Sequence, residues 1–359
     1  MVGDAAHVGR AVSASSSARR DVAIISFAQL PPVRRDTARE EVELVQPVVT
    51  AALRQAGLDR RDVGFVVSGS CDYLLGRPFS FVAALDGVGP WPPIAESHVE
   101  MDGAWALYEA WVRLQQGDID TALVYCYGKS SLGDLPDVLT QQLDPYYLAP
   151  LGVDALSLAA LQARALLDSG RVSERDLATV AAARRGGDIG ALLATPYLVE
   201  PLRRHDCPPI SDGACAVVLA AGERARQHHR PAWIRGIDHR VEPHQLGSRD
   251  LTRSPSTTIA AEHAGLGAVG PIDIAELHAP FSHQELILKD ALGLGASVTV
   301  NPSGGALAAN PMMVAGLTRL GEAATRIHDG TARTAVAHAT SGPCLQQNLV
   351  CVLSAEAAS

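Results

Sequence analysis

Short apolar runs alternate with amphipathic segments through the first third of the chain. The runs with the length and composition of buried strands are 21–30, 62–70 and 121–128. Two longer segments between them, 38–58 and 102–116, space their apolar residues at helical intervals. Asp102 stands at the start of the second segment and Gly117 just beyond its end. Strands that alternate with helices over short connections are typical of an α/β fold.

The same alternation returns in the last part of the chain, after a looser stretch. Residues 129–209 follow neither pattern closely, apart from a helical pair around 155–184, and we expect them to form an inserted loop or cap region. The segments that restore the alternation are 214–226, 232–241, a helix near 257–264, a strand at 272–279, a helix at 282–292 and a final strand pair at 334–341 and 348–355.

A short pattern recurs in both halves of the chain. The first half has a helix, the tripeptide Ala-Gly-Leu at 56–58, Asp62 and an apolar strand; the second has the same tripeptide at 264–266, then Asp273 and another apolar strand. The two tripeptides lie 264 − 56 = 208 residues apart. We therefore expect a duplicated α/β unit with five layers, αβαβα. The expected divisions are a disordered leader at 1–20, an N-terminal half at 21–128 and 210–226, the inserted cap at 129–209 and a C-terminal half at 227–359.

Composition narrows the function classes. The chain has 359 residues, and 47% of them are hydrophobic. Its formal net charge is −9, and its only lysines are Lys129 and Lys289. It therefore lacks the stripe of basic residues that binds nucleic acid. Its apolar runs are shorter than the roughly 20 residues of a membrane-spanning helix. Residues 1–20 lack the apolar core of a secretion signal. We expect a cytoplasmic protein that neither binds nucleic acid nor inserts into a membrane.

Two motifs suggest a cofactor or a metal, but their context does not support either. Residues 265–270 read Gly-x-Gly-x-x-Gly, yet a helix precedes them and a strand follows, the reverse of the order in dinucleotide-binding folds. His98 and Glu100 have the spacing found in zinc deaminases, but no Pro-Cys-x-x-Cys segment follows. The six cysteines include no Cys-x-x-Cys pair, so we expect neither a zinc ribbon, another metal site nor a disulfide framework.

Four segments that together span nearly the whole chain carry a recognisable set of motifs. Their boundaries are 97–131, 210–225, 276–285 and 301–320. The last begins Asn-x-x-Gly-Gly and continues into a turn and helix, and the third is a Glu-x-x-x-x-Phe block. They resemble the thiolase superfamily, specifically its sterol-carrier and lipid-transfer-protein branch. The resemblance implies a thiolase-like duplicated five-layer fold that acts on acyl-CoA thioesters, with coenzyme A as part of the substrate and no separate cofactor.

The chain departs from this family at the reactive positions. Glu100 stands where the family has its nucleophilic cysteine, three residues before Gly103, and a carboxylate cannot replace the thiolate of a Claisen thiolase. Asn310, which precedes Pro311, replaces the family's general-base histidine; alternatively, the two residues are the N-cap and first residue of a helix. Cys344 is the candidate for the family's second thiol.

What the resemblance retains is a means of stabilising negative charge on a thioester oxygen. The family's oxyanion hole corresponds to the backbone N–H groups of Glu100 and Gly342, donors of a kind commonly worth about 3 kcal/mol each in the barrier. His278 stands in the position of the family's Asn or His beside the substrate oxygen, and His278 or Glu100 would act as the base. Alternatively, Glu100 makes only a structural contact at a helix start, and His278 is an ordinary histidine at a strand end.

Three functions remain open. The first is a retro-aldol lyase that splits a β-hydroxyacyl-CoA with a hydrophobic, steroid-like or lipid-like body, together with a separate OB-fold, zinc-ribbon partner protein. The second is an acetyl-CoA acetyltransferase or other thiolase-type acyltransferase that uses Cys71, Cys126 or Cys344. The third is a non-catalytic thiolase-like subunit of a hetero-oligomeric complex. In each case the resemblance implies a dimer of thiolase-like chains.

Substrate recognition is expected to depend on the cap region, 129–209, whose readable features are its apolar and tyrosine content. The phosphate groups of coenzyme A require positive charge. The candidate pairs are Arg184 with Arg185 and Arg203 with Arg204, and the sequence does not rank them.

Overall fold

The computed structural model describes residues 19–358. Residues 1–18 of the expected leader lie outside the described residues. Arg20, at the leader's end, donates from its guanidinium to the backbone oxygens of Leu114 and Ile119, at 3.0 and 2.8 Å, which ties this residue to the first half of the fold. Within the described residues, no helix is both long enough and apolar enough to cross a membrane.

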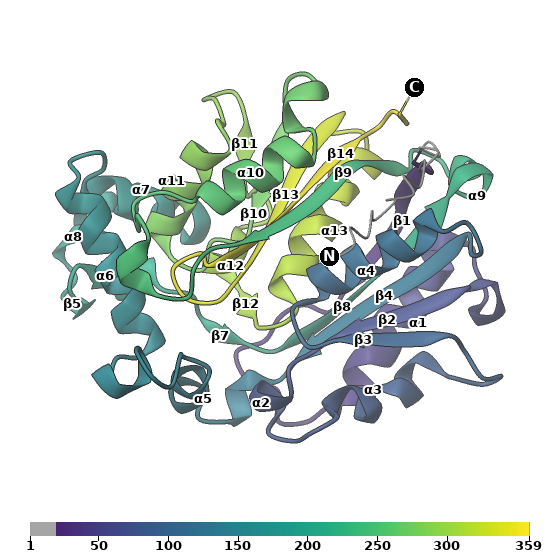
Figure 1. The fold of residues 1–359 in the computed structure, drawn as a ribbon, viewed down its shortest axis with the longest axis horizontal. Coiled ribbons are helices and arrows are strands. Elements are labelled where there is room, and N and C mark those ends of the chain that lie inside the picture. The colour runs from purple at the N-terminus through teal and green to yellow at the C-terminus, as the bar shows by residue number, and fades with distance from the viewer. Residues whose placement is uncertain (1–18, 359) are drawn as a thin grey trace, which may run out of the picture.

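Ten strands form one continuous sheet, in the order β11-β10-β13-β14-β9-β1-β8-β4-β2-β3 (Figure 1). The five strands of the first half are β1 (Val22–Gln29), β2 (Phe65–Gly69), β3 (Glu96–Val99), β4 (Thr121–Gly128) and β8 (Gly213–Ala221). The five strands of the second half are β9 (Ala232–Val241), β10 (Ile274–Leu277), β11 (Thr299–Val300), β13 (Thr334–Ser341) and β14 (Gln347–Ser354). The two halves meet where β1 pairs with β9.

The two halves of the sheet have the same topology. In each, the second strand pairs in parallel with the third and the fourth, and the fifth pairs antiparallel with the fourth and the first. Before the second strand of each half, a helix ends and a short 3-10 turn follows, at Arg60–Asp62 and at Leu266–Ala268. The duplication predicted from the repeated tripeptide is therefore confirmed.

Helices cover the outer faces of the sheet and fill the space between its halves. They are α1 (Glu41–Ala56), α3 (Ser80–Val88), α4 (Gly103–Gln115), α10 (Pro255–His263), α11 (Ser282–Ala291) and α13 (Ala315–His328). The largest apolar core joins α4 and α13 to residues of both halves, such as Val67 and Ala337. A second core joins α1 and α3 to the first half, and a third joins α10 and α11 to the second half. The order of layers is αβαβα, as predicted.

The start of α4 confirms the predicted cap and adds a link between the halves. The side chain of Asp102 accepts a hydrogen bond from the N–H of Ala104 at 2.9 Å. It also accepts from the N–H groups of Gly316 and Leu317, each at 2.9 Å. These two residues lie in the first turn of α13, so one buried carboxylate caps both helices of the central layer and fixes their N-termini side by side.

The chain between β4 and β7 forms a cap at one end of the molecule (Figure 1). Its elements are α5 (Leu135–Gln141), α6 (Ala155–Asp168), α7 (Glu174–Arg185), α8 (Ile189–Ala194), β5 (Tyr197–Val199) and β6 (Leu202–Arg203). After the cap, β7 (Ile210–Ser211) pairs in parallel with β12 (Asn310–Pro311), which brings the end of the cap beside Asn310. The remaining short helices are α2 (Asp72–Leu75), α9 (Gly222–Arg226) and α12 (Gly305–Ala308).

Candidate active site

His278 and Asn310 lie side by side, although they are 32 residues apart in sequence. His278 follows the last residue of β10, and Asn310 opens β12. The Nε2 atom of His278 is 3.0 Å from Oδ1 of Asn310, and its Nδ1 atom is 3.4 Å from the backbone nitrogen of Thr340. The structure thus brings together two of the site residues predicted from the sequence.

The surroundings of His278 determine where its proton lies. Only 7% of the residue is exposed, and burial lowers the pKa of its imidazole to about 4, so the ring is neutral near pH 7. Because the N–H of Thr340 donates to Nδ1, the ring hydrogen is on Nε2, which donates to Oδ1 of Asn310. The amide is thereby oriented with its Nδ2 hydrogens away from His278, as donors for another group.

Asn310 is not a helix cap. Asn310 and Pro311 are extended in β12, and α13 begins only at Ala315, so the alternative prediction for this pair is wrong. The reason is tertiary: the backbone oxygen of Met313 accepts a hydrogen bond at 3.0 Å from the N–H of Gly103, and β12 pairs with β7. These contacts with the first half hold the segment in an extended path before the helix starts.

The N–H of Gly342 lies on the same edge of β13 as the contact with His278. N–H groups two residues apart on a strand point to the same edge, and the N–H of Thr340 is directed at the ring of His278. Gly342 follows the last residue of β13, with φ +75°, and its N–H has no hydrogen-bond acceptor among residues 19–358. One of the two predicted oxyanion donors is therefore available on the side of the site.

A cavity of about 750 Å³ lies between the cap and the core, and two of its lining residues adjoin this cluster in the sequence or in the sheet. Its wall includes Phe281, three residues after His278, and Ile210, the pairing partner of Asn310. Leucines of the cap supply much of the remaining apolar lining. The charged lining consists of Asp154 and four arginines, Arg34, Arg35, Arg185 and Arg204.

The cavity distinguishes the two members of each candidate arginine pair. Arg184 and Arg203 are committed to ion pairs, with Glu285 at 2.7 Å and with Glu174 at 2.6 Å. The members that line the cavity are Arg185 and Arg204. None of the four cavity arginines forms an ion pair with a carboxylate in the described part of the chain. Burial, reinforced by neighbouring Arg34 and Arg204, lowers the pKa of Arg185, as expected where positive charges gather without a neutralising anion.

Glu100 lies apart from the His278 cluster. Its carboxylate accepts a hydrogen bond from the N–H of Asp72 at 2.6 Å and lies 3.2 Å from Nε2 of His98, and 48% of its side chain is exposed. Nδ1 of His98 is in turn 3.1 Å from Oγ of Ser68. No hydrogen bond within residues 19–358 joins Glu100 to His278. The two predicted bases are thus not brought together by direct contact.

The cysteines are buried thiols, all six of them free. Cys71 adjoins Glu100, and burial, with a contribution from that carboxylate, raises the pKa of its thiol. Cys344, 4% exposed, donates to the backbone oxygen of Leu158 at 3.3 Å, and burial raises the pKa of its thiol to about 12. Burial also raises the pKa of Cys126, which lies in the sheet. A thiol with a raised pKa is a poor source of thiolate.

Three features of the site were not found from the sequence. Thr340 acts through its backbone, which no side-chain motif reports. Arg34 and Arg35 follow β1 in a loop that gives no local sign of meeting the cap. The place of Phe281 in the cavity wall was not predicted either, although the residue ends the Glu-x-x-x-x-Phe block and that motif could have indicated it.

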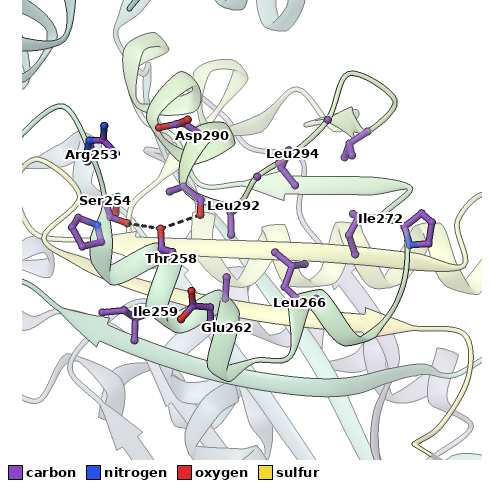
Figure 2. A pocket seen from close by; sticks show the side chains of 18 of the residues that line it. Arg253, Ser254, Thr258, Ile259, Glu262, Leu266, Ile272, Asp290, Leu292 and Leu294 are labelled. Carbon is purple, nitrogen blue, oxygen red and sulfur yellow. Dashed lines mark hydrogen bonds between the residues drawn. The ribbon is translucent and has the colours of Figure 1, made fainter. Parts of the chain in front are cut away.

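A second hollow, of about 910 Å³, lies on the outer side of the second half (Figure 2). It is bounded by α10, α11 and the loops that follow them, and Oγ1 of Thr258 donates to the backbone oxygen of Ala291 across it at 3.0 Å. None of the predicted site residues lines this hollow. The other cavity is lined by the candidate arginines Arg185 and Arg204 and by Phe281 and Ile210, which adjoin His278 and Asn310, so it is the candidate active site.

Two curated relatives resemble this chain over most of its length, and both are named acetyl-CoA acetyltransferase. That of Methanocaldococcus jannaschii is 26% identical over 348 residues, which cover 84% of this chain and 88% of the relative. That of Methanothermobacter thermautotrophicus is 24% identical over 323 residues, which cover 78% of this chain and 84% of the relative. No protein-family model matches the chain.

Solved structures share the fold over almost the whole chain. The structure titled Ltp2-ChsH2(DUF35) aldolase has a TM-score of 0.76 at 21% identity and covers 93% of this chain and 97% of its own. Human mitochondrial 3-ketoacyl-CoA thiolase has a TM-score of 0.74 at 16% identity and covers 93% and 98%. The duplicated topology and these similarities show that the chain has the fold of the thiolase superfamily, and its sequence is similar to that of acetyl-CoA acetyltransferases over most of its length.

Proposed function

We propose that this protein cleaves a β-hydroxyacyl-CoA by a retro-aldol reaction that uses no cysteine nucleophile. The proposal is based on the cluster of His278, Asn310 and the N–H of Gly342, which presents hydrogen-bond donors. Within the described chain, no cysteine thiol forms a hydrogen bond with any of these groups. Glu100, at the position of the family's nucleophile, cannot form a thioester. The fold similarity to Ltp2-ChsH2(DUF35) aldolase agrees with this chemistry.

In the proposed reaction, a base removes the proton of the β-hydroxyl group, its oxygen forms a carbonyl with Cβ, and the Cα–Cβ bond breaks. The electron pair moves onto the thioester, and the enolate oxygen accepts hydrogen bonds from Nδ2 of Asn310 and the N–H of Gly342. Protonation of Cα releases the shorter acyl-CoA, with an aldehyde or ketone as the other product. Of the two predicted bases, His278 is the one beside these donors, and a proton accepted at Nδ1 replaces the long hydrogen bond from Thr340.

The cavity supplies the means of holding such a substrate. We assign the phosphate groups of coenzyme A to the unpaired arginines Arg34, Arg35, Arg185 and Arg204, because guanidinium groups bind phosphate through paired, charge-assisted hydrogen bonds. The apolar cap side chains around Phe281 are suited to a lipid-like or steroid-like acyl body.

We also propose that the protein works in an assembly. The neighbour Ltp2-ChsH2(DUF35) aldolase is named as an aldolase of Ltp2 with ChsH2, which is marked as a DUF35 protein. For this chain we propose a dimer of thiolase-like chains bound to a separate partner protein, with the OB fold and zinc ribbon that the family resemblance implies.

An acyltransferase is the second candidate, and two observations favour it. Both curated relatives are named acetyl-CoA acetyltransferase. Cys71 also lies beside Glu100, close to where the family's nucleophile is expected. In that reaction Cys71 would attack a thioester carbonyl, expel the coenzyme A thiolate and carry the acyl group. Its raised pKa is the argument against this role.

Two measurements on the full chain separate these functions. The first follows β-hydroxyacyl-CoA esters of increasing acyl size by mass spectrometry, and a lyase releases equal amounts of shorter acyl-CoA and of aldehyde or ketone. The second measures the intact protein mass after exposure to acetyl-CoA, and an acyltransferase gains one acetyl group on Cys71. An acetylated thiol without cleavage would refute the lyase proposal. If the protein shows no cleavage and no acetylation, either with or without a DUF35-type partner, the result would indicate the third function, a non-catalytic subunit.

A further inference from the structure

We propose that Arg249, held by Glu242, is a positioning residue that fixes the turn at 342–345 and so aims the N–H of Gly342 at the substrate oxygen. This inference rests on the proposed function, because it assigns a task to the proposed oxyanion donor. Arg249 belongs to none of the motifs in the sequence and reaches the turn from the loop between β9 and α10.

The turn has a backbone conformation that needs support. Gly342, Cys344 and Leu345 all have positive φ, at +75°, +56° and +58°. The left-handed region costs a residue other than glycine roughly 1–2 kcal/mol. Two such residues next to each other persist only where surrounding contacts favour them, so the hydrogen bonds of this turn determine its shape.

Side chains from three other parts of the chain supply those contacts. The guanidinium of Arg249 donates to the backbone oxygen of Pro343 at 3.3 Å and to that of Cys344 at 2.6 Å. Gln162, from helix α6 of the cap, also donates to the oxygen of Cys344, at 3.3 Å. The oxygen of Leu345 accepts a bond of 2.8 Å from Nδ2 of Asn348 on β14. Arg249 is the one side chain of the three that holds two consecutive peptide groups.

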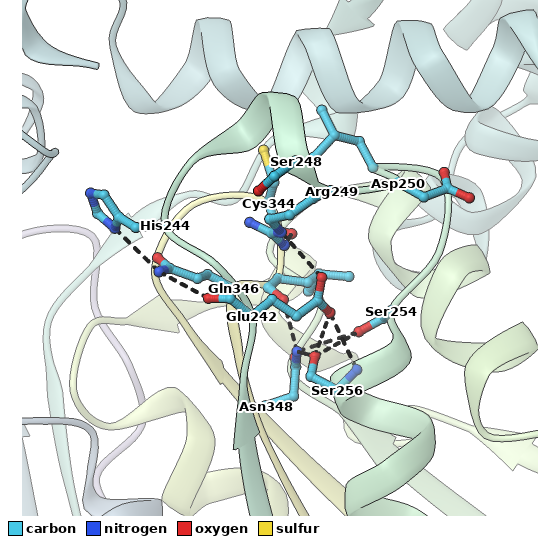
Figure 3. Close-up of polar contacts among 12 residues, drawn as sticks. Glu242, His244, Ser248, Arg249, Asp250, Ser254, Ser256, Cys344, Gln346 and Asn348 are labelled. Atoms are coloured by element: carbon cyan, nitrogen blue, oxygen red, sulfur yellow. Dashed lines mark hydrogen bonds and ion pairs between the residues drawn. The ribbon is translucent and has the colours of Figure 1, made fainter. Parts of the chain in front are cut away.

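Arg249 is itself held in place. Its Nε donates to Glu242 at 3.1 Å, and the two side chains are only 2% and 10% exposed. The other carboxylate oxygen of Glu242 accepts from the hydroxyl of Ser256 at 2.5 Å, and Oγ of Ser256 accepts from Nδ2 of Asn348 at 2.7 Å. Figure 3 shows this closed network, which runs from Glu242 through both Arg249 and Asn348.

The shape of the guanidinium explains why arginine stands here. Its planar fork directs three N–H groups at once, one to a carboxylate and two to neighbouring carbonyls. Lysine keeps the charge but offers a single ammonium, which cannot hold both carbonyls in this geometry. The substitution Arg249→Lys therefore separates the positioning role from a purely electrostatic one.

The experiment measures the site in two ways. Propionyl-CoA in deuterium oxide reports enolate formation through exchange of its α-hydrogens, and the infrared carbonyl band of bound, isotope-labelled propionyl-CoA reports hydrogen bonding to the thioester oxygen. We expect R249K to lower kcat for exchange by about tenfold to a hundredfold, since small misplacements of catalytic groups have effects of this size. We expect KM to change little, and the carbonyl band to return toward its position in free solution.

Two further variants guard against trivial explanations. Arg235→Lys is the matched control, because Arg235 also donates to two consecutive carbonyls, those of Glu356 and Ala357, near the C-terminal end. It should leave both readouts unchanged. Glu242→Gln keeps an acceptor for Arg249 but removes the charge, and it should give a smaller change in the same direction. This milder variant serves if R249K does not fold.

The outcomes distinguish this inference from the proposed function. A wild-type protein that binds propionyl-CoA without shifting its carbonyl band or exchanging its α-hydrogens refutes the proposed function itself. If the wild type does both and R249K lowers only the melting temperature, with kcat and the band unchanged, the positioning role of Arg249 is refuted and the ion pair is purely structural. Loss of kcat together with the band shift in R249K supports the inference.

Discussion

The substitution Asn310→Asp removes one hydrogen-bond donor from the site and changes little else. Aspartate has the same shape, and its carboxylate still accepts the hydrogen that Nε2 of His278 now donates to Oδ1 of Asn310 at 3.0 Å. The ring of His278 and its contact with Thr340 are therefore preserved. What is lost is the Nδ2 donor, which a negatively charged oxygen replaces.

The expected size of the effect follows from the role assigned to that donor. Removing one oxyanion donor typically lowers kcat by about a hundredfold to a thousandfold, or about 3–4 kcal/mol in the barrier. The added carboxylate repels the enolate, so the loss should lie at the upper end of this range. The affinity for coenzyme A should hardly change, because the arginine-lined part of the cavity is untouched.

The assay is α-hydrogen exchange of propionyl-CoA, with binding of coenzyme A measured separately by calorimetry. Asn310→Ala is the comparison, since it removes both the donor and the acceptor of His278 and should lower kcat at least as much. If N310D keeps kcat within about threefold of the wild type while binding coenzyme A normally, Asn310 does not contact the developing charge, and the proposed reaction loses its main support.

Three other predictions concern the cavity, the buried histidines and the second thiol. Arg34→Ala and Arg204→Ala should each raise KM for propionyl-CoA about tenfold to a hundredfold, since hydrogen bonds to charged groups are worth about 1.5–3 kcal/mol. KM for a truncated thioester without phosphates should stay unchanged. An equal rise in KM for both thioesters would contradict the assignment. Burial lowers the pKa of His278 to about 4 and those of His283 and His338 to about 3, from 6.5. The unfolded chain therefore takes up protons first, and each imidazole removes about 1.6 kcal/mol of stability between pH 6.5 and 5, or about 5 kcal/mol for the three. Urea unfolding across this range checks the sum, and a flat profile would show that the three rings are accessible to protons in the native state. Cys344→Ala should cost about 1 kcal/mol of stability and leave kcat unchanged; a loss of activity would favour the acyltransferase.

The fold could be predicted from the sequence because its signals are local and repeated. Strand-length apolar runs and helix ends such as those at Asp102 and Gly117 depend on neighbours in sequence, and the repeated tripeptide at 56–58 and 264–266 marks equivalent turns in both halves. The short edge strand β3 was not predicted, because its residues Glu96–Val99 mix polar and apolar side chains and are all only partly buried.

The site was predicted less completely, because its chemistry depends on contacts between distant segments. His278 and Asn310 were found from motifs, but the extended path of Asn310 is imposed by Met313 and by β7, which no local pattern reports. The cavity arginines come from the loop after β1, the end of α7 and the 3-10 turn at Arg204–Asp206, which meet only in the folded protein. Glu100 was expected near His278 from family spacing alone, and its exposed contact with His98 depends on how β2 and β3 end side by side.

These placements bear directly on whether a thiol could take part. A thiolase-type attack needs a thiolate within reach of the donors that stabilise the oxyanion. The proposed donors are positioned by Thr340, His278 and the turn at 342–345. Cys344 in that turn points instead to the backbone of Leu158 in the cap, and Cys71 lies beside Glu100. Burial raises the pKa of each thiol, and a neighbouring carboxylate makes ionisation of Cys71 still less favourable. Enolate stabilisation is the part of thiolase chemistry that needs only the donors, which is why we propose a carbon–carbon lyase rather than an acyl transfer for this arrangement of residues.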